Sequence, residues 1–378
     1  MPAPAGGLYV HLPFCPYICP YCDFAKWPLR RSQAERYLAA LEAELAAVPD
    51  FSATTLFFGG GTPNTCAPER IAALTAALRA RFALPADAEV TIELNPDLEL
   101  CLGFETYRAA GITRASFGVQ SFVAEELRAL GRGHSADDVS EAVRRARAAG
   151  FTNVSLDLIF AVPGQTLASW RRTLDAALAL EPEHVSTYGL TIEEGTPYAR
   201  WFSREPQRFS SQDDEAELYA AAIERLTRAG YEHYEISNFA KPGYRSRHNA
   251  NYWANGEYLG LGVGAASYLG GVRSVRTRDL EAYCSAALAG EPVPVEAERL
   301  TGDARTGEAA MLALRTSEGV DLAAFAERYG VDFTHRYGEV LEEQRSSGLL
   351  EVSPTHVRLT QRGRFVANDV CAAFVAPA

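Results

Sequence analysis

Short apolar runs rich in β-branched residues alternate along this chain with segments whose apolar residues recur at helical spacing, and this alternation restricts the fold more than any other feature. The predicted strands are residues 8–14, 55–58, 90–94, 114–119, 154–160 and 184–191. The clearest predicted helices are residues 33–48, 68–81, 136–149, 167–180 and 213–229. The pattern predicts an α/β fold with a parallel sheet and helices outside, either as an open sheet or as a curved partial barrel.

Polar residues and glycines stand where the predicted strands end. The glycine run 59–61 with Thr62 follows the second strand, Glu93 ends the third, Gln120 ends the fourth, and Asp157 interrupts the apolar fifth strand. Each has a purely structural interpretation, as a tight turn, a loop start or a buried carboxylate. Ligands bind at the carboxyl ends of the strands in such folds, so together these residues predict one binding face.

Three of the seven cysteines lie close together, at Cys15, Cys19 and Cys22, in a C-x3-C-x2-C pattern. An odd number of cysteines in a large chain argues against a disulfide scaffold and favours a metal centre. A structural zinc site needs a fourth ligand, and His11 is one candidate. The alternative is a [4Fe-4S] cluster held by three thiolates, which leaves one iron open to a cofactor or substrate.

Charge and composition exclude several classes of protein. The net charge of −12 argues against a large basic surface for binding nucleic acid, so no nucleic-acid partner is expected. No run approaches the ~20 apolar residues of a membrane span. The N-terminal residues 1–7 lack the charged and apolar regions of a signal peptide. A cytoplasmic location is therefore expected.

Two further regions differ from the alternating core. Residues 231–270 are dense in aromatic, amide and glycine residues without clean periodicity, which suits loops and short strands around a flat ligand. From about residue 300 the sequence predicts helices at 304–315, 322–329 and 333–346, a β pair at 349–352 and 357–360, and a closing helix. This order is typical of a small winged-helix-like module, expected to cap the main site.

The motifs together resemble a known family over nearly the whole chain. The cysteine motif, the Gly-Gly-Gly-Thr-Pro run and the polar strand ends are similar to those of the radical S-adenosylmethionine (SAM) superfamily. The motifs Tyr-x-His at 9–11, Gly-Val-Gln-Ser-Phe at 118–122, Gly-Arg-x-His at 131–134 and Asp-Leu-Ile at 157–159 resemble the oxygen-independent coproporphyrinogen III oxidase-like family. The His-Asn-x-Asn-Tyr-Trp motif at 248–253 resembles its HemW-type haem chaperone branch.

The resemblance implies a partial (β/α)6 barrel of the radical SAM type with three regions. These are a core domain at 1–235, a haem-binding and linking region at 236–298, and a winged-helix-like domain of the HemN C-terminal type at 299–378. It implies that Cys15, Cys19 and Cys22 ligate a [4Fe-4S] cluster. The residues implied to line the S-adenosylmethionine pocket are Tyr9, Tyr21, Gly61, Thr62, Glu93, Gln120, Arg132, Asp157 and Ile159. Chemically, Glu93 can accept from the methionine ammonium, Arg132 can pair with its carboxylate, and Asp157 can accept from ribose hydroxyls.

The branch of the family is indicated by two positions. The cysteine motif typical of the oxidases is C-x3-C-x2-C-x-C. In this chain Phe24 stands at the position of the fourth cysteine, which argues against decarboxylase activity. His248 is the expected axial haem ligand, with a hydrogen-bonded structural histidine as the alternative. Ala266 replaces a histidine that family members often carry, so a second ligand is not available there; His11, His134, His184 and His233 remain candidates.

The resemblance therefore implies a haem chaperone that binds haem, a [4Fe-4S] cluster and exchangeable S-adenosylmethionine and passes haem to an acceptor, expected to be membrane-associated. The alternatives are an oxygen-independent coproporphyrinogen III oxidase, a radical enzyme acting on another substrate, and a zinc-binding structural protein.

Overall fold

The computed structural model describes residues 6–375, and its centre is a twelve-stranded sheet. Six neighbouring strands of this sheet are parallel: β1 (Gly6–Leu12), β4 (Ala53–Gly60), β5 (Glu89–Leu94), β6 (Arg114–Gln120), β7 (Val154–Phe160) and β8 (His184–Gly189). They lie side by side in chain order, as right-handed strand–helix–strand crossovers require. The α/β fold and its six parallel strands are thus as predicted. Of the N-terminal residues 1–7 that were considered for a signal peptide, residues 1–5 lie outside the described residues.

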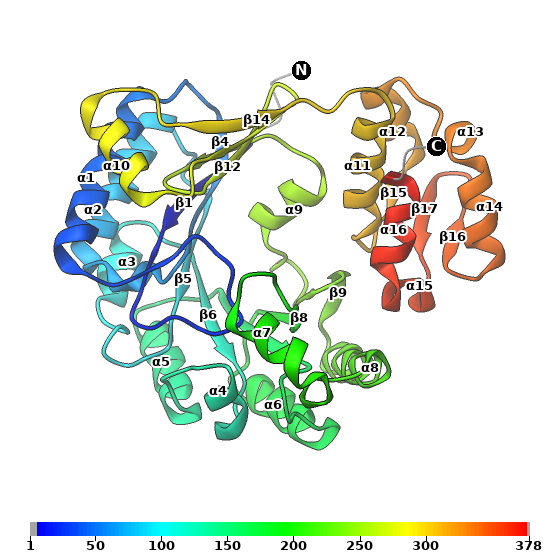
Figure 1. The fold of residues 1–378 in the computed structure, drawn as a ribbon, viewed down its shortest axis with the longest axis horizontal. Coiled ribbons are helices and arrows are strands. Elements are labelled where there is room, and N and C mark those ends of the chain that lie inside the picture. Colours follow the sequence, from blue (N-terminus) through cyan, green and yellow to red (C-terminus); the bar gives the residue numbers. More distant parts are fainter. Residues whose placement is uncertain (1–5, 376–378) are drawn as a thin grey trace.

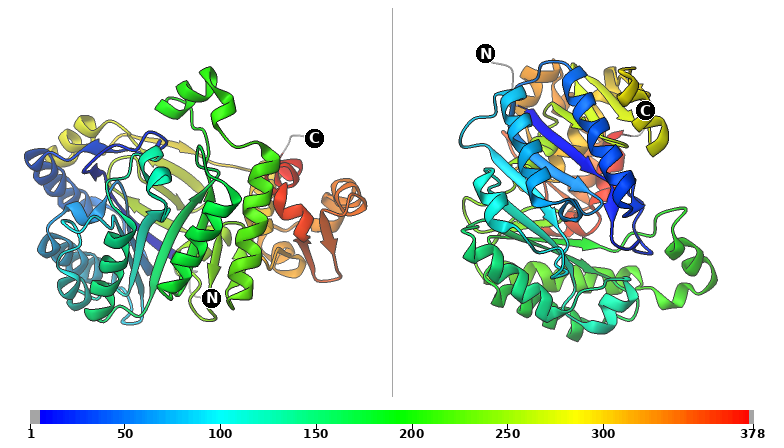
Figure 2. Two further views of the ribbon diagram at one scale, coloured as in Figure 1. Left: turned by 90° about the horizontal axis from the view of Figure 1, so that it is seen from below. Right: turned by 90° about the vertical axis from the view of Figure 1, so that its left-hand side faces the viewer.

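Helices cover the outer face of the curved sheet, which matches the expected partial (β/α)6 barrel (Figure 1). The helices between consecutive parallel strands are α1 (Arg31–Ala47), η1 (Pro63–Thr65), α2 (Pro68–Phe82), α3 (Phe104–Ala109), α4 (Ala124–Ala129), α5 (Ala136–Ala148) and α6 (Leu167–Ala179). Capping boxes begin α5 at Ser135 and α6 at Thr166, where side-chain oxygens accept from unpaired backbone N–H groups of the first turn. After β8 come α7 (Pro197–Arg204), η2 (Pro206–Arg208) and α8 (Gln212–Arg228). In the left view of Figure 2, the segment with α7 projects from the body of the molecule.

Residues 232–298 extend the same sheet at both of its edges. Beyond β8 lie β10 (Asn238–Ala240) and β9 (Glu232–Glu235), and beyond β1 lie β11 (Tyr258–Leu261), β12 (Ala266–Leu269), β13 (Val272–Arg276) and β14 (Val295–Glu298). The helix α10 (Leu280–Ala289) packs on α1. One buried apolar cluster runs from Leu8 to Ala287 and includes residues of this region.

The His-Asn-x-Asn-Tyr-Trp motif is helical, contrary to our expectation of loops and short strands. It forms α9 (Arg247–Trp253), whose N-cap Ser246 accepts a hydrogen bond from the backbone N–H of Asn249. Seven residues are too few to display a clear helical period, and the cap supplied the available local signal.

The C-terminal module has its own apolar core, from Ala309 to Phe374. It consists of α11 (Gly302–Leu314), β15 (Val320–Asp321), α12 (Leu322–Tyr329), α13 (Phe333–Arg336), α14 (Gly338–Ser346), β16 (Leu350–Val352), β17 (His356–Leu359), α15 (Gln361–Phe365) and α16 (Ala367–Val375). The strands form a small antiparallel sheet in the order β15–β17–β16. The predicted helix at 333–346 is interrupted at Tyr337, whose backbone leaves the helical conformation. Figure 1 places α9 between this module and the sheet.

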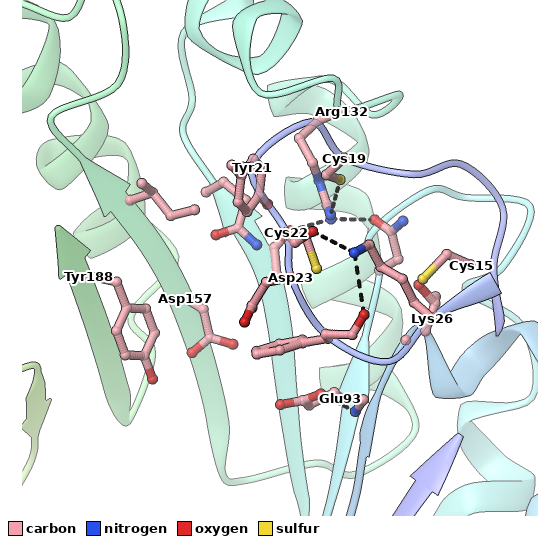
Figure 3. A pocket seen from close by; sticks show the side chains of 18 of the residues that line it. Cys15, Cys19, Tyr21, Cys22, Asp23, Lys26, Glu93, Arg132, Asp157 and Tyr188 are labelled. Carbon is pink, nitrogen blue, oxygen red and sulfur yellow. Dashed lines mark hydrogen bonds between the residues drawn. The ribbon is translucent and has the colours of Figure 1, made fainter. Parts of the chain in front are cut away.

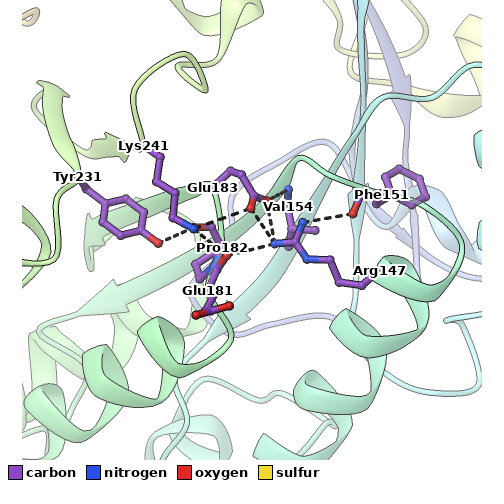
Figure 4. A network of polar contacts seen from close by, with 8 residues as sticks. All are labelled: Arg147, Phe151, Val154, Glu181, Pro182, Glu183, Tyr231 and Lys241. Atoms are coloured by element: carbon purple, nitrogen blue, oxygen red, sulfur yellow. Dashed lines mark hydrogen bonds and ion pairs between the residues drawn. The ribbon is translucent and has the colours of Figure 1, made fainter.

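A polar network fastens the start of β8 to its neighbours (Figure 4). The Glu183 carboxylate accepts from the backbone N–H of Val154 at 2.9 Å and pairs with Arg147 at 2.8 Å. The Tyr231 hydroxyl donates to the carbonyl of Pro182. These bonds satisfy polar groups at the edge of the core and hold the strand ends in register. Within residues 6–375 no helix is long and apolar enough to cross a membrane.

Candidate functional site

The three clustered cysteines lie on a loop that is held at both ends. The loop connects β2 (Phe14–Cys15) to β3 (Trp27–Pro28), and the backbone N–H groups of Trp27 and Leu29 donate to the carbonyls of Pro13 and Cys15, each at 2.9 Å. Between these anchors the chain is short and irregular, which turns Cys15, Cys19 and Cys22 toward one cavity (Figure 3).

This first cavity has a volume of about 380 Å³ and lies at the carboxyl ends of the parallel strands. Apart from the three cysteines, it is lined by eight of the residues expected in the S-adenosylmethionine pocket: Tyr21, Gly61, Thr62, Glu93, Gln120, Arg132, Asp157 and Ile159. The ninth, Tyr9, lies elsewhere: it lines a second cavity, and its hydroxyl is 2.9 Å from Nδ1 of His11. The strand ends at Gly61, Glu93, Gln120 and Asp157 therefore share one cavity.

A buried arginine lies beside one cysteine. Arg132 follows α4, and its Nη1 is 3.7 Å from Sγ of Cys19, while Nη2 donates to Oδ1 of Asn95 at 2.7 Å and to the carbonyl of Gly118 at 2.8 Å. Its Nε is buried and has no partner among the described residues. Because an unpaired buried donor is costly, this nitrogen suits an acceptor supplied by a ligand.

Two carboxyl groups form the other side of the cavity (Figure 3). Glu93 accepts from the backbone N–H of Gly60 at 3.1 Å, and burial together with the nearby Asp157 raises its pKa to about 7. Asp157 accepts from Ser186 at 2.7 Å and from Ser116 at 3.1 Å, yet burial raises its pKa as well. Carboxyl groups with elevated pKa values in a cavity mark a site that can accept a cationic ligand.

The backbone at the end of β6 is strained. Gln120 has a φ of 67°, a left-handed conformation that non-glycine residues rarely adopt, and the pairing of β6 with β7 shifts register between Gly118 and Gln120. Such strain is common at binding sites, where it directs a side chain out of the regular strand pattern.

The donor set fits a thiolate-bound cluster better than a single metal ion. Burial raises the pKa of the Cys15 and Cys22 thiols, and the ammonium of Lys26 opposes this shift in both. The ring nitrogens of His11 are bonded to groups other than the cysteines: Nδ1 is 2.9 Å from the Tyr9 hydroxyl and Nε2 is 2.7 Å from the carbonyl of Ala25. Both ring nitrogens are thus bonded inside the protein, so the structure does not show the zinc site with His11.

The second cavity, of about 600 Å³, adjoins the first, with Phe24, Gly60 and Glu93 on both linings. Its other walls come from β1, from the loop that joins β2 to β3, from α9 and the hairpin β12–β13, and from α11 of the C-terminal module. They are aromatic at Tyr9, Tyr252 and Tyr258 and cationic at Arg273 and Arg278, and they include Ala266. Sequence reasoning missed the two arginines.

His248 lines neither cavity. It is 1% exposed, its Nδ1 is 2.8 Å from Oγ1 of Thr55, and its Nε2 is 2.8 Å from the hydroxyl of Tyr252. Burial lowers its pKa to about 3, which keeps the imidazole neutral. An iron atom can reach neither nitrogen in this conformation, so the structure favours the structural interpretation of His248 over the expected haem ligation.

Three other candidate histidines are also hydrogen-bonded inside the protein. His134 is 3.0 Å from the carbonyl of Val119, His184 lies between Ser155 and Tyr234, and His233 lies between Ile236 and Arg364. Of the candidates for a second ligand, His11 is the one that lines the second cavity.

Comparison with known proteins agrees with this arrangement. Residues 9–177 match the Radical SAM superfamily, and residues 300–366 match the HemN C-terminal domain. The solved structure of coproporphyrinogen III oxidase (HemN) from Escherichia coli, a radical SAM enzyme, superposes with a TM-score of 0.86 at 26% identity, covering 100% of this chain and 91% of that one. The barrel and the three-cysteine cavity are thus those of a radical SAM protein, a class that carries a [4Fe-4S] cluster and binds S-adenosylmethionine.

Curated relatives narrow the assignment. The heme chaperone HemW of Bacillus subtilis is 36% identical over 97% of this chain and 98% of its own length. HemW of Mycobacterium tuberculosis is 38% identical over 98% of this chain and 95% of its own length. The chain belongs to the HemW family.

Proposed function

We propose that this protein is a haem chaperone, which binds haem in the second cavity and passes it to an acceptor protein. The observation that carries the proposal is the second cavity itself: a large space with aromatic and cationic walls, directly beside the cavity that holds the cysteines. Membership in the HemW family, whose curated members are named heme chaperones, supports the same function.

In the first cavity, Cys15, Cys19 and Cys22 would ligate a [4Fe-4S] cluster, which with S-adenosylmethionine supplies one-electron chemistry when bound. The other eight lining residues predicted from the sequence would hold S-adenosylmethionine. Of these, Arg132 offers an unpaired Nε to the carboxylate, and Glu93 offers an acceptor to the ammonium. Tyr9 is left out of this set because it lines the second cavity.

Three features of the second cavity suit haem. Tyrosine rings can pack against the faces and edges of a flat macrocycle, and arginine guanidinium groups can pair with its carboxylates. Ala266, at the position where family members often carry a histidine, lines this cavity. His248 is not part of the proposal, because both of its ring nitrogens are bonded inside the protein.

The proposal includes a cytoplasmic location and a membrane-associated recipient, as expected from the sequence. The support is chemical: haem is poorly soluble, and many haem proteins that need delivery are embedded in membranes.

A haem titration with a matched pair of variants tests the proposal. Ala266→Phe places a bulky ring in the second cavity, whereas Ala297→Phe changes an exposed alanine of β14 outside it. We expect about one haem per chain, read from the Soret absorbance, for the unmodified protein and Ala297→Phe, and a large loss for Ala266→Phe.

Equal haem binding by both variants would place haem elsewhere. An anaerobic assay with dithionite, S-adenosylmethionine and coproporphyrinogen III is run on the same preparation. Robust formation of protoporphyrinogen would favour the oxidase alternative and overturn the chaperone assignment.

A further inference from the structure

Arg273 connects the second cavity to the C-terminal module. It lies on β13 and lines the cavity, and its Nη1 is 2.5 Å from Oε2 of Glu308 on α11. Its guanidinium also lies 5.9 Å from the ring centre of Tyr268. A second carboxylate, that of Glu298, pairs with Nη1 at 3.7 Å, a longer distance than that to Glu308. One guanidinium therefore faces both the cavity and the module.

The Glu308 side chain depends on this contact. It is 11% exposed, and in the described part of the chain Arg273 is the hydrogen-bond donor to its carboxylate. A buried carboxylate that loses its partner is strongly disfavoured. A ligand that takes Arg273 therefore also disfavours the docked position of α11.

Other contacts hold the module without involving the cavity lining. Arg245 pairs with Glu318 at 2.5 Å, and Arg328 donates to the carbonyl of Ala254 at 2.6 Å. The guanidinium of Arg315 lies 5.1 Å from the ring centre of Trp253. Because these contacts are independent of Arg273, its loss would loosen α11 without releasing the whole module.

A second arginine in the cavity has no counter-charge. Nη2 of Arg278 donates to the carbonyl of Asp23 at 2.6 Å, and within residues 6–375 it forms no ion pair. The acidic group on the cavity lining, Glu93, belongs to the part shared with the first cavity. Two cations on the wall of an aromatic cavity match a flat ligand with two carboxylates.

We propose that Arg273 and Arg278 bind the two propionates of haem, and that the propionate at Arg273 displaces Glu308 and loosens α11 of the C-terminal module. The inference rests on the proposed function, because it assumes haem in the second cavity. It adds a consequence: loading of haem changes the attachment of the module, which gives the acceptor a conformational signal that cargo is present.

Two ligands and three variants test the recognition step. Haem and haem dimethyl ester share the macrocycle, but the ester lacks the two negative charges. We expect Arg273→Met to weaken haem binding about tenfold while leaving the affinity for the ester unchanged. Arg299→Met, which changes an exposed arginine outside the cavity lining, should bind both ligands as the unmodified protein does. Glu308→Gln should bind haem more tightly, because it removes the nearer of the two carboxylates that pair with Arg273.

Hydrogen–deuterium exchange over α11 tests the coupling step. Haem should increase exchange in residues 302–314, the ester should not, and Glu308→Gln should show raised exchange without ligand. Equal loss of both ligands in Arg273→Met would give Arg273 a role in cavity shape and overturn recognition. Unchanged exchange in α11 with haem bound would overturn the coupling. If the unmodified protein binds neither haem nor ester, the proposed function fails first.

Discussion

The elevated pKa of Glu93 predicts that S-adenosylmethionine binding depends on pH in a range where most carboxylates do not titrate. Glu93 lies at the junction of both cavities, and its pKa is raised to about 7 by burial and by Asp157, while Gly60 and Arg114 act in the opposite direction. A group with this pKa is about one-tenth ionised at about pH 6 and half ionised at about pH 7. The ligand ammonium, with an ordinary pKa of about 7.7–8.0, stays protonated over that range.

The expected effect follows from these fractions. If the ammonium is attracted only by ionised Glu93, the dissociation constant should fall about fivefold between about pH 6 and about pH 7, equivalent to about 1 kcal/mol. The sign is that binding strengthens as the pH rises, because ionisation creates the acceptor. Bound ligand should in turn lower the pKa of Glu93.

Equilibrium dialysis with labelled S-adenosylmethionine on cluster-loaded protein measures this dependence. Glu93→Gln should bind weakly and with no pH dependence over the range, whereas Glu99→Gln, which changes an exposed carboxylate, should behave as the unmodified protein does. Asp157→Asn should move the transition to lower pH, because it removes a negative charge that raises the pKa of Glu93. A fivefold change that persists in Glu93→Gln would refute the reasoning.

Four further outcomes are expected. Cys15→Ser should abolish the brown colour and the broad absorbance near about 400 nm of reconstituted protein, and Cys284→Ser, in the buried core away from the cavity, should retain them. Glu44→Gln should lower the free energy of unfolding by about 3–5 kcal/mol in denaturant titrations, because it leaves Arg276 buried without its charge partner. His248→Ala should cost about 2–4 kcal/mol of stability, since two buried hydroxyls lose their partner, while the Soret band on haem addition is retained. Ala266→His should give tighter haem binding and a shifted Soret band, because it adds an imidazole to the cavity wall.

Local sequence patterns were sufficient for the framework of the fold. The six parallel strands, the helices between them and the elements of the C-terminal module were predicted because apolar period and capping residues are read within a few neighbouring positions. The small helix α9 and the strands β13 and β14 were not predicted, and β9–β12 were expected only as short strands somewhere within residues 231–270, because segments of seven residues or fewer carry too little periodic signal. Their positions depend on pairing with strands distant in the chain, such as β11 with β1.

The candidate site divides in the same way. The cysteine spacing, the glycine run and the polar strand ends predict the first cavity, because the carboxyl ends of parallel strands must meet at one edge of the sheet. The order of residues along β1 does not show which cavity a side chain of this strand lines, because β11, which pairs with β1, comes from a distant part of the chain. Tyr9, on β1 between β4 and β11, consequently lines the second cavity instead of the first.

What the sequence by itself determined is therefore the class of protein: the alternation requires a parallel sheet, and three thiols within eight residues require a common centre at its open edge. Tertiary packing was needed to show that His248 is hydrogen-bonded between Thr55 and Tyr252, that Arg273 and Arg278 line one cavity, and that Glu308 pairs with Arg273. Burial and charge pairing depend on contacts between elements that are separated along the chain, such as α9 with β4 and β13 with α11, and local sequence patterns carry no information about such contacts.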